Sequence, residues 1–382
     1  MTGLECLDDE IFSLPKSVGK EGMIKYLENI FREYQETLEL ISDQTLAREL
    51  RLQTDNISTV CKNFISSLSH HQNGHIQNAY NDFKNAMSII KPFLFPEKKG
   101  GVVITKGLYK PLYRARIGSN KAYSKSQMFH LPFSEREFAN TQRFSVPGLP
   151  CLYLSNSIYV CWEELNRPPL SKFQVSRFQQ ENSNLKILNI SFTPIQLKWH
   201  CKTYEENKGQ GKYDYDYLLF WFLMVWPLSL VCSLSVMNEE VPFKQEYIFP
   251  QFLLEWVTSE KDIDGIKYFS VKANPYNKED FSYFTNYVFP PKKMDSGNYC
   301  SHLKKSFKLS DPFSVEVFEI ADPNFIFLTK EWLEKVKYKV MPEIIRLELI
   351  EGHLMPYTHT LFGKMEMFMQ NLEVDFLNEE SL

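Results

Sequence analysis

One stretch of the sequence restricts the fold more than any other, because from Tyr217 to Asn238 the chain runs for 22 residues without a charged side chain. A run of this length can cross a bilayer as a helix, so it has to be buried either in lipid or in a protein core. Pro227 lies in its middle, and acidic residues flank it where a membrane segment usually carries Lys or Arg. We therefore expect a buried helix that breaks at Pro227 and continues as a buried strand. A membrane protein is the alternative.

The composition is that of a chain that folds around its own core. Of the 382 residues, 43% are hydrophobic and 24% are charged, which excludes disordered, collagen-like and coiled-coil proteins. The net charge of −4 provides no overall attraction for nucleic acid or for an anionic membrane. The 7 cysteines are scattered without a C-x-x-C pair, and the acidic first residues do not resemble a secretory signal. We expect a cytoplasmic protein that binds neither nucleic acid nor membrane.

Apolar residues recur at helical spacing through the first part of the chain. Three such patterns run over 23–41, 46–68 and 76–90, and we expect the third to stop at Pro92. Residues 1–95 are therefore predicted to form a small all-α bundle with a regulatory or oligomerising role. The polar, turn-rich residues that follow, up to Gly101, predict a domain boundary.

Beyond Gly101 the sequence changes to short β-rich runs mixed with a few helical segments, which indicates an α+β or mixed α/β fold. The predicted strands are 101–105, 152–154, 185–190, 266–271 and 314–320. We expect a second domain over 101–325 and a C-terminal extension over 326–382 that packs on or beside it.

Polar residues suited to anion binding and acid–base chemistry gather in four segments of this second region. Arg114 and Arg116 are two positions apart, so on a strand both would project to one side. The second segment contains Arg143 ahead of a Pro-Gly turn, Tyr153 on a short strand, and Glu163 and Glu164 in an aromatic helix. The third segment is FKQEYIFPQFLLEWV, and the fourth is DGIKYFSV, which contains Ser270.

In this order the segments resemble the RES domain, a family similar in fold to the ADP-ribosyltransferases whose members consume NAD. The resemblance covers 108–290, about half of the chain. The family pattern falls on Tyr113 and Arg114, then Arg143, Tyr153 and Glu164, and later on Pro250, Gln251, Asp264, Gly265, Tyr268 and Ser270. Glu163 is the alternative to Glu164, and Ser145 stands where the family commonly has Asn.

The resemblance implies an ADP-ribosyltransferase-like mixed β core that binds NAD as its substrate and uses no metal. Arg114 and Arg143 would bind the pyrophosphate through charge-assisted, bidentate hydrogen bonds. The Glu164 carboxylate would stabilise the positive charge that develops on the ribose when the bond to nicotinamide breaks. Tyr113, Tyr153 and Ser270 would contact the nicotinamide and the ribose, which makes Glu164, Arg114 and Ser270 the implied catalytic residues.

The implied activity is that of an NAD glycohydrolase or phosphorylase which acts as a toxin or defence effector. Its partners would be NAD and an inhibitory, antitoxin-like protein or its own N-terminal bundle, and we expect a homo-oligomer. A protein or nucleic-acid ADP-ribosyltransferase is the first alternative, because the acceptor of ADP-ribose is not encoded in these motifs. A catalytically silent interaction protein is the second.

Two other patterns favour a structural interpretation. Glu135, Arg136 and Glu137 spell the E-x-E of some ADP-ribosyltransferases, but they precede Ser270 instead of following it, so we interpret them as a solvated face. His70, His71 and His75 cluster without carboxylates or thiols at ligand spacing, which favours a polar loop over a metal site.

Overall fold

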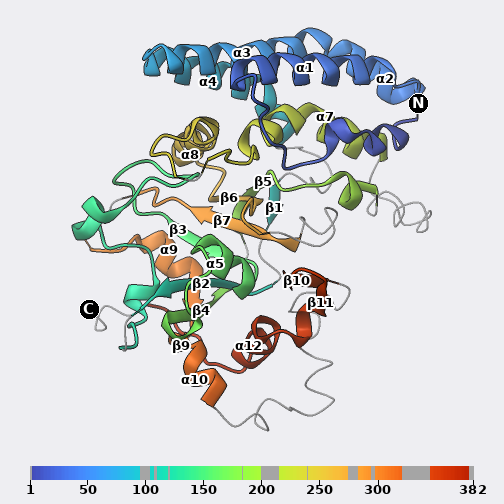
Figure 1. Cartoon of the computed structure of the whole chain (residues 1–382). Coiled ribbons are helices and arrows are strands. Elements are labelled where there is room, and N and C mark those ends of the chain that lie inside the picture. Colours follow the sequence, from blue (N-terminus) through green and yellow to red (C-terminus); the bar gives the residue numbers. More distant parts are fainter. Residues whose placement is uncertain are drawn as a thin grey trace. The chain divides into compact units, whose positions relative to one another are not determined.

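The computed structural model of the chain describes residues 2–94, 104–106, 110–118, 121–182, 184–198, 215–238, 240–273, 283–293, 297–320 and 345–377. It is an α+β protein with a helical N-terminal region and a β-sheet, which confirms the predicted class (Figure 1). Its residues form two compact units. The first consists of Met1–Thr105, Gln142–Ser145 and Leu188–Val257, and the second of Lys106–Thr141, Val146–Ile187 and Thr258–Leu382. The predicted domain boundaries near residues 95–101 and 325–326 fall outside the described residues, so they stay predictions.

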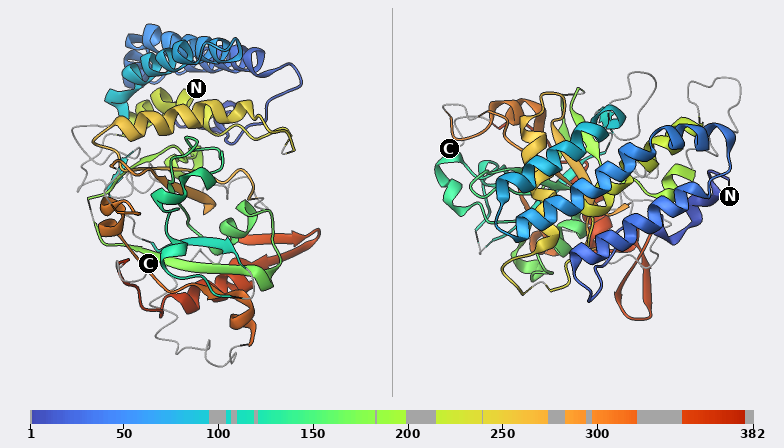
Figure 2. Two further views of the ribbon diagram at one scale, coloured as in Figure 1. Left: turned by 90° about the vertical axis from the view of Figure 1, so that its left-hand side faces the viewer. Right: turned by 90° about the horizontal axis from the view of Figure 1, so that it is seen from above.

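Four amphipathic helices begin the first unit: α1 (Met23–Glu39), α2 (Gln44–Leu52), α3 (Thr54–Gln72) and α4 (Ile76–Leu94). The second predicted pattern is divided into two helices, because Gln53 has a non-helical backbone with φ −105°. Pro92 lies inside α4, which continues to Leu94, so the predicted stop at Pro92 is wrong. The missing N–H of Pro92 leaves the carbonyl of Ser88 without its helical donor, but Ser88 is exposed, so water can hydrate that oxygen. Figure 2 shows α1, α3 and α4 side by side above α7 (Tyr215–Cys232) and α8 (Ile248–Ser259).

Helix α7 contains the charge-free segment up to Cys232 and runs through Pro227 without interruption, so the predicted break is wrong. A proline has no N–H to donate to the carbonyl four residues earlier, which here belongs to Leu223. The hydroxyl of Tyr34 in α1 donates a hydrogen bond to that oxygen at 2.7 Å. A side chain from another helix thus replaces the missing bond, and the helix continues. The predicted strand is reduced to one bridge between Ser235 and Ser17.

Across the described residues, α7 included, no helix combines the length and the apolar character that a membrane crossing requires. Within the first unit α7 is instead surrounded by protein. Its Trp226 ring stacks on Tyr34, with ring centroids 4.6 Å apart, and meets Phe12 edge-on. The segment is therefore part of a core, as the sequence analysis expected.

The sheet of the second unit follows the order β6, β7, β3, β2, β4 and β8, with β9 beside β4. The strands are β2 (Leu112–Ile117), β3 (Leu152–Ser155), β4 (Phe173–Gln180), β6 (Gly265–Phe269), β7 (Thr285–Phe289), β8 (Phe307–Leu309) and β9 (Phe313–Ser314). Neighbouring strands in this order are antiparallel. The remaining strands β1 (Ile104–Lys106) and β5 (Lys186–Asn189) carry the chain from one unit to the other.

The strand predicted over 314–320 is wrong beyond its first residue, because α10 (Val315–Ile320) follows β9 directly. Val315 and Phe318 are both buried, whereas Val317 is 54% exposed. Burial three positions apart is the spacing of a helix and not the alternation of a strand.

Both faces of the sheet are covered. Tyr113 of β2 packs in a cluster with α5 (Ile158–Glu164) and α12 (Leu361–Met369). Its neighbour Leu112 belongs to a second cluster with α9 (Ser301–Ser306). Successive strand residues point to opposite faces, so this alternation assigns each side chain of β2 to one side of the sheet. A separate hairpin of β10 (Arg346–Ile350) and β11 (His353–Pro356) precedes α12.

Candidate functional site

Glu164, the last residue of α5, is the centre of the strongest polar arrangement in the second unit. Its Oε1 accepts hydrogen bonds from Ser270 Oγ at 2.7 Å and from Asn286 Nδ2 at 2.5 Å. Ser270 and Asn286 are buried, whereas Glu164 is partly exposed. Among the described residues no donor reaches Oε2. We call Glu164, Ser270 and Asn286 the Glu164 cluster: a carboxylate held by two buried donors on one oxygen while the other remains available.

The two donors of the Glu164 cluster are themselves held in place by the sheet. Asn286 lies on β7 opposite Ser155 of β3, and the Ser155 hydroxyl donates to Asn286 Oδ1 at 2.6 Å. That bond orients the amide so that its Nδ2 faces Glu164. Ser270 follows β6, and its N–H donates to Phe284 O at 2.9 Å. The Glu164 carboxylate therefore meets preformed donors.

The sequence analysis missed Asn286. The signal that could have revealed it is an amide in a strand, TNYVF, that is otherwise apolar or aromatic apart from its first residue. A buried amide requires hydrogen-bond partners, so it indicates a polar site nearby.

The two adjacent glutamates of α5 have different surroundings. Glu163 is buried, and its two oxygens accept hydrogen bonds from Nε and Nη2 of Arg167, each at 2.9 Å. This pairing raises the pKa of Arg167, whose guanidinium also lies over the Trp162 ring. Both oxygens of Glu163 are thus occupied by an ion pair, and the geometry favours Glu164 as the residue that can meet a ligand.

Arg114 lies where β2 and β3 separate. The two strands pair at Tyr113 opposite Ser155, and beyond that point Arg114 Nη1 donates to the backbone oxygen of Tyr153 at 3.2 Å. Arg114 Nε is buried without a hydrogen-bond partner among the described residues. Burial lowers the pKa of Arg114 to about 10, so the guanidinium is still charged at neutral pH. A partly buried cation with an unused, buried donor where two strands separate is a candidate for binding an anion.

The structure does not bring all the predicted site residues together. Tyr113 is buried, and its hydroxyl accepts a hydrogen bond from Gln370 Nε2 at 3.0 Å, beside α12. Tyr113 pairs with Ser155, which pairs with Asn286, so these three side chains share one face of the sheet, whereas alternation along β2 puts Arg114 on the opposite face. On β3, Tyr153 shares a face with Ser155 and so with Asn286 of the Glu164 cluster. Burial raises the pKa of the Tyr153 hydroxyl well above its usual value.

Arg143 belongs to the first unit and is buried there. Its Nη1 donates to Leu234 O at 2.8 Å, and the guanidinium lies 5.0 Å from the centre of the Tyr247 ring. Ser145, which stands where the family commonly has Asn, accepts a hydrogen bond from the Gln142 N–H at 2.6 Å. These contacts hold the short segment Gln142–Ser145 within the first unit.

Two further residues of the family pattern have structural contacts. Asp264 Oδ2 accepts the Lys186 N–H at 2.8 Å, and its Oδ1 lies 3.2 Å from His302 Nε2. Gln251 Nε2 donates to Gln142 O at 3.3 Å. Asp264 and Gln251 thus connect segments that are distant in the sequence. Neither residue is a member of the Glu164 cluster.

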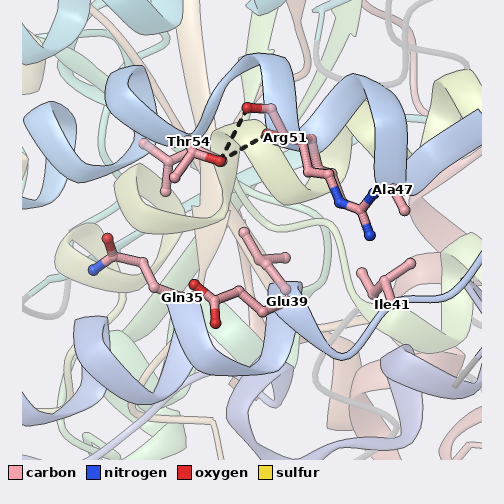
Figure 3. A pocket seen from close by; sticks show the side chains of 9 residues that line it. Gln35, Glu39, Ile41, Ala47, Arg51 and Thr54 are labelled. Atoms are coloured by element: carbon pink, nitrogen blue, oxygen red, sulfur yellow. Dashed lines mark hydrogen bonds between the residues drawn. The ribbon is translucent and has the colours of Figure 1, made fainter.

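A cavity of about 270 Å³ lies in the first unit between α1, α2 and the start of α3 (Figure 3). Its walls combine aliphatic side chains such as Leu38 and Leu50 with the polar Gln35, Glu39 and Arg51. None of the predicted site residues lines it, so it is separate from the chemistry considered above.

In the part of the chain that the structure describes, no three or more His, Cys, Asp or Glu residues gather as metal ligands would. His70 Nδ1 lies 2.7 Å from the Asp82 carboxylate, a partner that the sequence analysis did not foresee. Residues 135–137, the E-x-E motif, are exposed, as expected of a solvated face.

Comparison with known proteins gives one informative similarity. The chain is 31% identical over 354 residues to the putative toxin YopC of Bacillus subtilis (strain 168). The aligned part covers 92% of this chain and 76% of that protein. No protein-family model matches the chain, and no solved structure matches it.

Proposed function

Because the chain belongs to the family of the putative toxin YopC, we propose that it is a toxin and that it acts by cleaving the nicotinamide–ribose bond of NAD. The first half of the proposal follows from the relative's name. The second half follows from the resemblance to the RES domain together with the geometry around Glu164. We further propose that it acts in the cytoplasm, and that an inhibitory protein and a second copy of the chain are its partners.

The observation that carries the proposal is the pair of hydrogen bonds at Glu164 Oε1. Cleavage of the bond builds positive charge on the ribose, and a carboxylate beside it stabilises that charge more than it stabilises the neutral sugar. The carboxylate acts best when it is held in place before the reaction, since no free energy is then needed to reorient it at the transition state. Ser270 and Asn286 supply that restraint and leave Oε2 to face the ribose.

Arg114 is the second element of the proposal. Its buried Nε has an unused hydrogen atom, and a guanidinium binds phosphate oxygens in a way that Lys does not reproduce. Strand alternation puts Arg114 on the face of the sheet opposite to Asn286 of the Glu164 cluster, so its assignment to the pyrophosphate of NAD stays a prediction of the resemblance. The roles of Arg143, Tyr113 and Tyr153 in binding NAD stay predictions of the resemblance as well.

The test is to incubate the purified full-length chain with NAD and to measure free nicotinamide over time. Glu164→Gln should slow its release by about 10²–10³-fold, the usual cost of removing a preorganised electrostatic group. Glu163→Gln is the matched control on the same helix and should stay within about threefold of the wild type. Absence of nicotinamide release from the wild type, or equal effects of both substitutions, would refute the assignment.

The fate of ADP-ribose separates glycohydrolase from transferase. Free ADP-ribose indicates transfer to water, its phosphate ester indicates transfer to phosphate, and label retained on protein or nucleic acid indicates an ADP-ribosyltransferase. The toxin role is tested apart from the chemistry by inducing the chain in a bacterial host. If Glu164→Gln abolishes growth arrest, toxicity depends on the Glu164 chemistry. If growth arrest survives the substitution, toxicity has another cause.

A further inference from the structure

A buried carboxyl group lies at the opposite end of the helix that carries the partly exposed Glu164. Glu366 of α12 is 1% exposed, and its Oε1 accepts hydrogen bonds from the Ile158 N–H at 2.7 Å and from the Tyr357 hydroxyl at 2.5 Å. Ile158 is the first residue of α5. A residue 208 positions later in the sequence therefore binds one of the N–H groups that a helix cannot satisfy by itself.

Helix α5 needs such external contacts because it has only 7 residues. A helix of two turns is not stable alone, so its position depends on its caps and its packing. Ser157 is its N-cap residue and accepts the Val160 N–H at 3.1 Å, and Glu366 accepts the N–H of Ile158. From Ile158 to Glu164 the helix rises about 9 Å, so a displacement at its start is passed to the carboxylate at its end.

The segment that carries Glu366 is itself held closely against its surroundings. Thr360 caps α12 by accepting the Gly363 N–H at 3.2 Å. A side chain at Gly363 would lie 2.3 Å from Tyr357 O, so only glycine allows α12 to pack directly on the turn that carries Tyr357. Phe362 of α12 also lies against Trp162 of α5, with ring centroids 5.3 Å apart. The segments around Glu366 are thus closely packed against one another.

We propose that Glu366 is a positioning residue, which fixes the start of α5 and thereby places the Glu164 carboxylate against Ser270 and Asn286. The proposal rests on the proposed function, because NAD cleavage is where the effect on catalysis would be observed. It also gives a role to residues 345–369, which lie beyond the part of the chain that resembles the RES domain.

The chemistry of the site indicates which substitutions separate positioning from mere folding. Burial raises the pKa of Glu366 to about 8, so at neutral pH the carboxyl is mostly protonated and resembles an amide in shape and charge. Glu366→Gln keeps an oxygen acceptor for the Ile158 N–H and the Tyr357 hydroxyl. Glu366→Leu keeps much of the volume but removes the acceptor.

The experiment compares the full-length wild type with both variants by hydrogen exchange of the amides of α5 and by kcat and KM for nicotinamide release. Glu366→Gln should match the wild type. Glu366→Leu should speed exchange in α5 by about tenfold or more and lower kcat about tenfold, with KM for NAD changed less than about threefold. Exchange in α1, in the other unit, should be the same in all three proteins and serves as the internal control.

Unchanged exchange in α5 of Glu366→Leu would overturn the proposal, as would a kcat that falls equally in Glu366→Gln. If Glu366→Leu does not fold, Tyr357→Phe replaces it: this variant removes one of the two donors, and it should speed exchange in α5 by a smaller factor. Absence of NAD cleavage by the wild type would refute the proposed function but not the role of Glu366 in holding α5. The hydrogen-exchange comparison decides that role separately.

Discussion

Replacing Tyr34 by phenylalanine removes one hydroxyl group from the core of the first unit and leaves the ring in place. The ring stacks on Trp226 and meets Phe12 edge-on, and neither contact involves the hydroxyl. What is lost is the 2.7 Å hydrogen bond to Leu223 O. Since Pro227 has no N–H for that carbonyl, the substitution leaves a buried acceptor without a donor.

The expected loss of stability depends on whether another donor can replace the lost hydrogen bond. A hydrogen bond that water can replace contributes about 1 kcal/mol, but an acceptor left unsatisfied in a core costs about 1–3 kcal/mol. We expect Tyr34→Phe to lower the free energy of unfolding of the first unit by about 2 kcal/mol. In a Pro227→Ala background the restored N–H can bind Leu223 O, so the same substitution should cost only about 0.5 kcal/mol.

The assay is a double-mutant cycle of the wild type, the two single variants and the double variant. Free energies come from native-state hydrogen exchange of the α7 amides and from guanidinium unfolding. A coupling between the two positions of about 1–2 kcal/mol is expected. Equal costs of Tyr34→Phe with and without Pro227 would show that the hydroxyl does not compensate for the proline.

Three more predictions concern the second unit. Because burial raises the pKa of Glu366 from 4.5 to about 8, the contribution of Glu366 to the free energy of unfolding should be greatest below pH 4.5 and fall by on the order of 5 kcal/mol as the pH rises through 8. In urea titrations across this range, Glu366→Gln should flatten that decline. Asn286→Ala removes one donor to Glu164 and should lower kcat for nicotinamide release by about 10–100-fold; an unaltered kcat would exclude it from the site. Gly363→Ala should lower the free energy of unfolding by about 1–3 kcal/mol because of the clash with Tyr357 O, and a raised melting temperature would contradict this.

The sequence by itself determined the features that depend on near neighbours. Apolar spacing located α1 and α4, because residues three and four apart share one face of a helix. Short β-rich runs located β3 and β6 to within one or two residues. The absence of charge from Tyr217 to Asn238 required burial, and the structure buries residues 218–234 of that segment within protein.

The tertiary structure decided whatever depends on partners far away in the chain. The continuity of α7 through Pro227 rests on Tyr34, which lies 189 positions before its acceptor Leu223 and which no local pattern reveals. The difference between Glu163 and Glu164 is likewise set by which of them meets the donors of β6 and β7. A hydrogen bond is satisfied by whichever group the fold brings within reach, so spacing along the sequence predicts the elements but not the pairings on which the Glu164 cluster depends.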